Sequence, residues 1–538
     1  MTRKKKEIPI GRNPIQPNKK KQHKLQNIPL GILVFILVWI FCGGIYGDVF
    51  YITEQFSFFA FDSVLMKEVT DIWYAPIMII GRLFLLLFKY PLLGGLMYAL
   101  VLTCSAWLIS YIFNLKGYFR LISAFVPFAW LFVLEYLGLN IFYQYEPSFV
   151  CSYPLLFLFV LILIAASVRL VTKRKFKESW LYYKKEKTIE NYSAVVFCLL
   201  LFTAMTAFAQ TKGQNTVYTA KMQRMLQKQD WDGIVSLGSK AKQPSRPVAC
   251  YYAIALEMTD QLNEKLFDMF YQYPDIKLVN RTGGADVGTF MYEPDADFYS
   301  GLVLPSYHNN MEHVVASGLT IYRLKQLYLC ALANKETSLA EKYMTILEKV
   351  PFEGNFVNRY KPMMYDRNLV MADPVLSKVI DMMPTKDVLE EQFINPLFLA
   401  YYKSVASGRS LYVYKNSLAA SLYTKDINDF LNLMTVYNLN GAVPEAFYDV
   451  FVIYAIKSKN KEFLANAPVY CIRRIQQMLK EARQMGDIDK KIKAQKLREK
   501  YSGSYAYYYY YQNVPDENYN TPTESAPEGK EKKYNKVN

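Results

Sequence analysis

Five long apolar runs within the first 210 residues limit what this chain can fold into more than any other feature. They are 28–46, Leu92–Phe113, Leu121–Phe142, Val150–Leu170 and Ser193–Ala209. Each is near the roughly 18–20 residues with which a helix crosses a hydrocarbon core of about 30 Å. A single run of this kind could equally be a buried core helix. Five in succession predict a transmembrane helix bundle over residues 28–209, preceded by a basic tail at residues 1–27.

The charges around these runs predict how the bundle is oriented. The tail carries nine bases and the segment Arg169–Lys187 carries eight, so the positive-inside rule places both in the cytoplasm. A sixth apolar stretch, Ile72–Tyr90, contains Arg82. If it crossed fully, Arg169–Lys187 would lie outside, against the rule. We therefore expect five spans plus one re-entrant or interfacial helix, in a bacterial inner (cytoplasmic) membrane, with a cytoplasmic N-terminus and residues 210–538 in the periplasm.

Between residues 210 and 500 the helical period returns in short pieces, which predicts an irregular array of α-helical hairpins. The expected pairs are Trp231–Ala241 with Val248–Glu257, Leu319–Leu332 with Ser338–Val350, Leu397–Val405 with Ser410–Leu422, and a helix after Asp426 with Ala446–Ile456. Antiparallel pairs about 30–40 residues apart are typical of tetratricopeptide-like stacks, although no strict repeat can be aligned here. The predicted fold class is all-α.

Three segments of the second half depart from the hairpin pattern. Residues 270–310 are rich in Pro, Gly and Asp, and we expect a long loop or a small insertion. Ile472–Lys500 reads as one polar closing helix, and residues 501–538 read as a Tyr-rich low-complexity tail. The cluster Tyr507–Tyr511 is expected either to pack back on the array or to lie at an interface.

The charge distribution argues against a nucleic-acid-binding protein. Of the net charge of +16, most lies in residues 1–209, where 22 Lys and Arg face 11 Asp and Glu. Those bases stand beside apolar runs, whereas a nucleic-acid-binding patch should lie on a folded domain.

The sequence also predicts no metal and no cofactor. His308 and His313 are five residues apart, which does not align two nitrogens on one helix face. Glu293, Asp295 and Asp297 resemble a calcium loop only loosely, because the later ligand positions and the glycine do not fit. The seven cysteines are widely spaced and predict neither a zinc site nor a disulfide framework.

The best candidates for chemistry are charged residues in and beside the spans. Asp48 and Glu54 follow the first run, Arg82 lies in the sixth stretch, and Glu135 lies within the third run. Ionisable groups in spans are costly and usually face a cavity or a partner. One interpretation is a structural salt bridge between Arg82 and Glu135. The other is a polar site at the outer face, with Asp48 or Glu54 as base and Arg82 holding an anionic headgroup.

Several short stretches resemble an uncharacterised family of multi-span membrane proteins of anaerobic Gram-negative bacteria. They are Thr53–Gln55, Leu83–Gly95, Ala340–Phe352 and Tyr505–Tyr511. Where relatives carry Pro-Gly-Gly before the re-entrant helix, this chain has Tyr74–Pro76. The resemblance implies a membrane bundle followed by an outer helical-hairpin domain of tetratricopeptide-like type, and it implies no activity.

Two functions of different class follow from these observations. The first is an interaction protein whose helical array docks a periplasmic partner, since helix stacks present extended binding surfaces. The alternative is a glycosyltransferase-like enzyme that uses a polyprenyl-linked donor, with the acids after the first span at its site. The expected partners are the lipid bilayer and either a periplasmic protein or a lipid-linked molecule.

Overall fold

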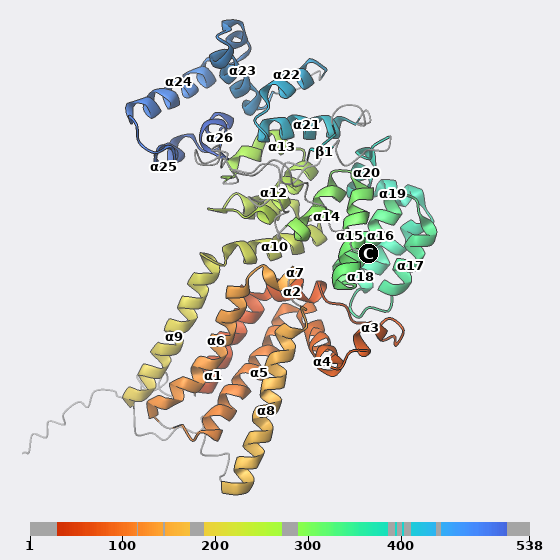
Figure 1. Ribbon diagram of the computed structural model, residues 1–538, viewed down its shortest axis with the longest axis vertical. Helices are drawn as coiled ribbons and strands as arrows, with labels where there is room; N and C mark the ends of the chain where they lie inside the picture. Colours follow the sequence, from red (N-terminus) through yellow and green to blue (C-terminus); the bar gives the residue numbers. More distant parts are fainter. Residues whose placement is uncertain are drawn as a thin grey trace, which may run out of the picture.

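The computed structural model describes residues 30–115, 117–143, 146–172, 188–271, 289–385, 393–394, 401–402, 410–436 and 443–513. A bundle of long helices stands at one end, and a stack of shorter helices lies on top of it (Figure 1). The prediction of an all-α protein is confirmed. In the described part of the chain the strands are β1 (Phe393–Ile394) and β2 (Tyr401–Tyr402), one antiparallel pair with Phe393 opposite Tyr402.

The bundle contains the helices of the first 210 residues. They are α1 (Leu30–Ile40), the π-helix η1 (Phe41–Ile45), α2 (Gly47–Gln55), α3 (Lys67–Thr70), α4 (Ala75–Leu85), the 3₁₀-helix η2 (Leu86–Lys89), α5 (Pro91–Ile112), η3 (Gly117–Phe119), α6 (Arg120–Leu137), α7 (Asn140–Tyr143), α8 (Phe149–Thr172) and α9 (Thr188–Gln210).

Four of these helices are long and apolar enough to cross a membrane, namely α5, α6, α8 and residues 192–210 of α9. A fifth candidate is the pair formed by α1–η1 and α2, which bends by 60°. In α8 only 11% of the apolar window is buried within the protein. A helix that is apolar on all sides and exposed on most of them is suited to a lipid environment rather than to water.

The bend in the first candidate span lies at a close contact with α5. A Cβ atom on Gly95 of α5 would come within 2.5 Å of the backbone nitrogen of Gly43 in η1. Only glycine leaves room for two backbones at this separation. The contact therefore holds the π-helical turn against α5, and α2 leaves it in a new direction.

The stretch Ile72–Tyr90 forms α4 followed directly by η2, and it is not among the candidate spans of the described residues. Its helix α4 has 11 residues and is therefore about 16 Å long, roughly half of a hydrocarbon core. It packs against the array end of α8, where a Cβ atom on Gly81 would overlap the hydroxyl of Ser152. Its re-entrant or interfacial position in a membrane stays a prediction.

The array contains the remaining helices. They are α10 (Gln214–Lys228), α11 (Trp231–Gly238), α12 (Arg246–Met258), α13 (Leu262–Lys265), η5 (Leu266–Asp268), α14 (Thr289–Tyr299), α15 (Val303–Ser317), α16 (Ile321–Ala333), α17 (Thr337–Leu347), α18 (Gly354–Tyr360), η6 (Lys361–Met364), α19 (Arg367–Ala372), α20 (Pro374–Asp381), α21 (Leu411–Tyr423), α22 (Ile427–Val436), α23 (Glu445–Ser458), η8 (Lys461–Asn466), α24 (Val469–Gln484), α25 (Lys490–Tyr501) and α26 (Tyr505–Tyr511).

The first two predicted hairpins are confirmed as α11 with α12 and α16 with α17. The later pairing is confirmed only in part. Helix α22 contacts α23 through the rings of Phe430 and Phe447, whose centroids are 4.9 Å apart, but α22 packs mainly against α21, and α23 packs mainly against η8, α24 and α26. Residues Tyr401–Tyr402 of the expected helix 397–405 are extended, and its other residues lie outside the described ones.

Two further expectations differ from the structure. The proline-containing segment after residue 288 is helical, because α14 and α15 form a hairpin there; residues 272–288 lie outside the described ones. The expected single helix Ile472–Lys500 is divided into α24 and α25. Between them Gly486 has a positive φ of 66°. Glycine adopts this left-handed conformation easily, and helices commonly end at such a residue.

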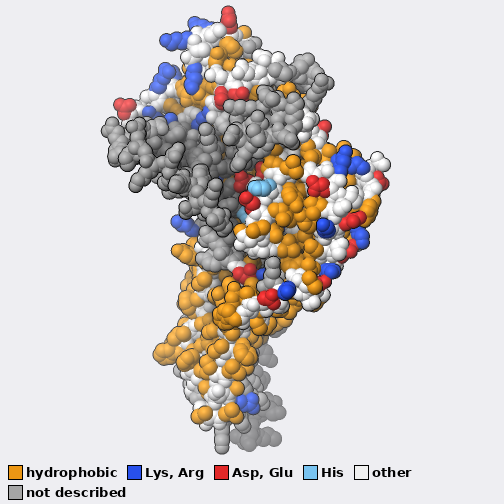
Figure 2. Space-filling view, turned by 45° about the vertical axis from the view of Figure 1, so that its right-hand side comes forward, with side chains coloured by type: hydrophobic (Ala, Val, Ile, Leu, Met, Phe, Trp, Pro, Cys, Tyr) orange, Lys and Arg blue, Asp and Glu red, His pale blue; other side chains and the backbone are white. Residues whose placement is uncertain are grey.

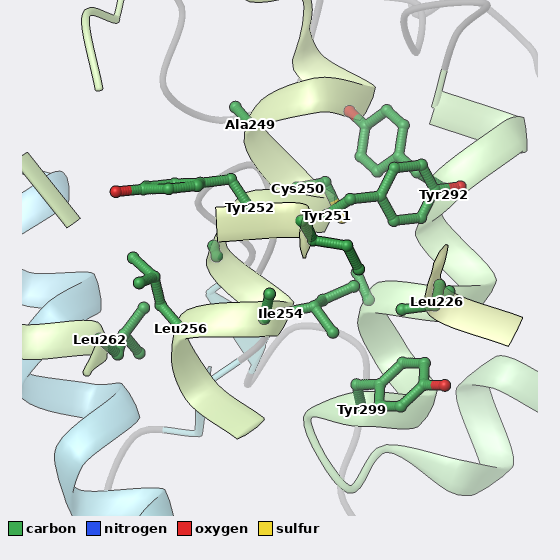
Figure 3. Packing of buried hydrophobic residues seen from close by; sticks show 14 of the residues in the cluster. Leu226, Ala249, Cys250, Tyr251, Tyr252, Ile254, Leu256, Leu262, Tyr292 and Tyr299 are labelled. Atoms are coloured by element: carbon green, nitrogen blue, oxygen red, sulfur yellow. The ribbon is translucent and has the colours of Figure 1, made fainter. Parts of the chain in front are cut away.

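The array core is centred on α12, which is buried on every side (Figure 3). Tyr251 and Tyr252 extend from it in different directions, toward the neighbouring helices (Figure 3). The tyrosine cluster forms α26, which packs back on the array. Its Tyr508 is buried against Tyr271 and Tyr423. All seven cysteines are free thiols in this structure.

Candidate functional site

The acids that follow the first apolar run lie on α2, where that helix contacts the array. The carboxylate of Asp48 accepts a hydrogen bond from Arg224 on α10, with an Oδ1–Nη1 distance of 2.5 Å. The same guanidinium lies 4.7 Å from the centre of the Tyr51 ring. Both charged side chains are partly exposed. Asp48 therefore joins α2 to the first helix of the array.

Arg82 and Glu135 are not partners, so the expected salt bridge between them is wrong. The Arg82 guanidinium pairs with Glu146 at 3.0 Å and donates a second hydrogen bond to the carbonyl of Phe58 at 2.9 Å. Glu135 is buried near the array end of α6, close to Tyr46. Neither of its carboxylate oxygens has a hydrogen-bond partner. The four residues therefore do not converge on one site.

A different set of charged groups meets where the bundle touches the array. Glu353 lies in the turn before α18 and forms two ion pairs. Its Oε1 is 2.5 Å from Nζ of Lys89 on η2, and its Oε2 is 2.7 Å from Nζ of Lys325 on α16. Gln55 of α2 donates to Glu353 at 3.0 Å and accepts from Lys325 at 2.7 Å. Together with Glu54, these residues are called the junction network below.

Glu54 lies at the bundle side of the junction network. Its Oε2 accepts a hydrogen bond from the side chain of Gln55 at 2.7 Å, and its Oε1 has no hydrogen-bond partner. The side chain is buried, so it is not accessible to a substrate from solvent in this arrangement. Its contacts instead extend the network from α2 toward Lys89 and Lys325.

The electrostatics of the network favour the ionised state of Glu353. Burial by itself would raise the pKa of this carboxyl, but the ammonium groups of Lys325 and Lys89 outweigh that effect and hold the pKa below its ordinary value. Burial lowers the pKa of Lys325, and Glu353 partly offsets this. The two ammonium groups thus share the carboxylate of Glu353 within hydrogen-bond distance, and this offsets part of the cost of burying them.

Sequence reasoning missed Lys325 and Glu353 because their partners are far away in the chain. Lys89 and Glu353 are 264 positions apart, and Lys325 and Gln55 are 270 apart. One local signal was available. Arg323 and Lys325 interrupt the otherwise apolar stretch Leu319–Leu332, and charges within a buried helix are expected to have partners.

The comparison with known protein families decides what the chain belongs to. The model of a family of unknown function, DUF6057, matches residues 21–172 and 127–512, which includes both the bundle and the array. The chain belongs to this family. No curated protein and no solved structure matches it. The family description assigns no activity to DUF6057, so an argument about function rests on the residues themselves.

The acids that resembled a calcium loop have other roles in this DUF6057 protein. Asp295 lies on α14 and accepts hydrogen bonds from the hydroxyls of Tyr251 at 3.1 Å and Tyr322 at 2.6 Å, and from the amide of Gln326. Asp297 accepts from the amide of Asn309 at 2.9 Å. Burial raises the pKa of Asp295 to about 7. The donors to Asp295 come from α12 and α16, and the donor to Asp297 comes from α15, so both side chains are bound by groups of the protein itself.

The two histidines of the array both lie on α15 of this family member. His308 and Glu312 are an exposed pair one helical turn apart, with a nitrogen–oxygen distance of 3.5 Å. Burial lowers the pKa of His313 to about 4, so it is neutral at physiological pH. Among the described residues, no group of three or more His, Cys, Asp or Glu side chains has the geometry to hold a metal ion.

Proposed function

We propose that this protein is a multi-span protein of the bacterial inner membrane that presents its helical array, residues 210–500, in the periplasm as a docking surface for another protein. The observation that carries the proposal is the junction network. It attaches the array to one end of the bundle through buried ion pairs. Its charged side chains bind one another and do not line an open substrate site.

The position of the bases supports the orientation. The ends of the bundle helices away from the array carry Arg120 at the start of α6 and Arg169 in the last turn of α8 (Figure 1). The basic tail joins α1 at the same end. By the positive-inside rule this end is cytoplasmic, which puts the array and the C-terminal residues on the outer side.

The surface of the array supports the docking role. Figure 2 shows hydrophobic side chains gathered over the lobe that contains α15 to α19. Exposed large hydrophobic residues on these helices and the turns between them include Leu304, Tyr365, Leu369 and Met371. Apolar patches on a folded surface mark interaction sites more often than chance, and stacked helices present such patches in a rigid arrangement.

Cysteine labelling tests the topology. Ser338 on α17 is exposed in the array, and Val171 at the far end of α8 is exposed on the other side of the bundle. In a variant whose native cysteines are replaced, an impermeant maleimide applied to cells with only the outer membrane opened should label Ser338→Cys and not Val171→Cys. The reverse pattern would overturn the proposed orientation.

Photocrosslinking in cells tests the docking role. A photoreactive amino acid at Tyr365 or Leu369 should give one discrete protein adduct, whereas the same group at Val469, which is exposed on α24 away from the patch, should not. Equal, diffuse adducts at all three positions would contradict a defined docking surface.

The alternative enzyme function, a polyprenyl-dependent glycosyltransferase, depends on Asp48. This residue remains partly exposed at the outer end of the bundle, which leaves it accessible to a headgroup, although it is already paired with Arg224. In a strain that depends on this protein, Asp48→Asn should abolish function at normal protein level if Asp48 is catalytic. Under the docking proposal the variant should retain function.

A further inference from the structure

The segment between α2 and α4, residues 57–74, directs its apolar side chains in two opposite directions. It is called the α3 loop below. Phe58, Phe59 and Met66 point inward and belong to the buried core of the array. Phe61, Val64 and Trp73 point outward, and their exposed fractions are 79%, 79% and 90%. Packing in the array core explains why the inward-facing side chains are apolar, but it does not explain the outward-facing ones.

The α3 loop is held in place at several points. The backbone carbonyl of Phe58 accepts a hydrogen bond from Arg82 of α4, and that of Ser57 accepts one from the amide of Ile321 at 3.1 Å. Asp62 pairs with Lys349, which follows α17, at 2.7 Å. The outward apolar residues are therefore presented by an anchored segment, and their exposure does not result from a loose chain.

The position of the loop relative to the spans indicates what covers it. Trp73 is two residues before α4, which packs on the array end of α8. Exposed tyrosines mark the same end of the neighbouring spans, with Tyr153 near the start of α8 and Tyr136 near the end of α6. Trp and Tyr concentrate at membrane–water interfaces because one part of each ring system is apolar and another is polar.

We propose that the α3 loop lies in the interfacial layer of the outer leaflet, with Phe61, Val64 and Trp73 inserted among the lipid headgroups. The partner is the bilayer that the bundle spans, so the inference rests on the proposed function. Its support is continuity, because the apolar surface of the bundle reaches the underside of the array lobe at this level (Figure 2).

The charges of the α3 loop indicate which lipids it accepts. Lys67 and Asp71 are exposed, and Asp62 is neutralised by Lys349. The loop thus presents no cluster of bases of the kind that recognises anionic lipids. Insertion is driven by the apolar side chains, as in other interfacial segments, and zwitterionic lipid suffices. Lys349 belongs to the array and pairs with Asp62 of the α3 loop. With the α3 loop inserted, this part of the array therefore lies against the membrane surface.

Depth-dependent quenching tests the proposal on the full chain. Val64→Cys, in a variant without native cysteines, is labelled with an environment-sensitive dye and reconstituted in phosphatidylcholine vesicles. Spin-labelled lipids carry the quencher at carbon 5, near the headgroup, or at carbon 12. We expect several-fold stronger quenching by the shallow quencher than by the deep one, and the same result at Ser63→Cys, whose native side chain is polar.

Two control positions distinguish a failure of the α3 loop proposal from a failure of the proposed membrane-spanning bundle. Ile162→Cys, in the middle of α8, should be quenched most strongly by the deep quencher, and Val469→Cys on α24 by neither. If Ile162 responds and Val64 does not, the α3 loop proposal is wrong and the spanning bundle stands. If Ile162 does not respond, the bundle itself does not span. A dye at Val64 that is shielded from water but not quenched would indicate a protein partner and would also overturn the proposal.

Discussion

Lys89 of the bundle and Glu353 of the array form an ion pair with an Nζ–Oε1 distance of 2.5 Å, although 264 positions separate them in the chain. Lys325 occupies the second oxygen of the same carboxylate. One side chain thus holds two lysines from two different parts of the fold. Several predictions about stability depend on this and similar buried contacts.

Glu353→Gln should be strongly destabilising. It leaves Lys89 and Lys325 buried without a counter-charge, and breaking a buried pair in this way typically costs about 3–5 kcal/mol. Unfolding can be followed in detergent with a thiol-reactive dye, since Cys250 and Cys330 are fully buried in the array. The midpoint temperature should fall clearly.

The control for this variant is Glu348→Gln. Glu348 pairs with Lys361 on the surface of the array, and surface pairs contribute only about 0–1 kcal/mol. Similar losses in the two variants would show that the junction network is not a special point of attachment.

The array should become less stable as the pH rises from about 5 to about 8. Burial raises the pKa of Asp295 to about 7 and that of Glu257 to about 7. A carboxyl whose pKa is higher in the folded state than in the unfolded chain contributes stability at low pH, and this is lost as the pH rises through the folded-state pKa.

The opposite sign applies to Glu353. Its pKa is held below the ordinary value, so its contribution is present above about pH 4.5 and is lost as the pH falls through the lowered pKa. Stability measured against pH should therefore have a maximum in the weakly acidic range. Asp295→Asn should flatten the decline toward pH 8, and an unchanged decline in this variant would contradict the assignment to Asp295.

Removal of α26 should unfold the outer part of the array. Tyr507 donates a hydrogen bond to the carbonyl of Ala494 at 2.7 Å, and the backbone amide of Ala506 donates to Asp449 at 3.0 Å. A chain that ends after Ser504 loses these contacts and exposes Phe267, which packs against Tyr508. It should be degraded or aggregate on expression, whereas a chain that ends after Asn513 keeps α26 and should lose far less.

The ion pair of Asp48 and Arg224 should contribute little to stability. Both side chains are partly exposed, so Asp48→Asn should shift the free energy of unfolding by about 1 kcal/mol or less. The same dye-based measurement checks this. A loss as large as that of Glu353→Gln would mean that Asp48 belongs to the buried attachment, and its use as a probe of catalysis would then be compromised.

The local pattern of the sequence determined the class of the fold and its largest elements. Long apolar runs such as Val150–Leu170 can only be satisfied by helices that face lipid or a large core, and the 3.6-residue period of Leu319–Leu332 and its partner determined a hairpin. Both signals depend on neighbouring residues alone. Arg82 inside an apolar stretch likewise indicated that α4 is short.

Tertiary structure alone decided which charges meet. Arg82 looked like the partner of Glu135 because both interrupt apolar runs, yet Arg82 pairs with Glu146 and both carboxylate oxygens of Glu135 are left without a hydrogen bond. The junction network joins Gln55, Lys89, Lys325 and Glu353 from four separate elements. No sequence period relates such positions, because their distances depend on how whole helices pack. An ion pair between two helices forms only when the fold places both side chains within contact distance.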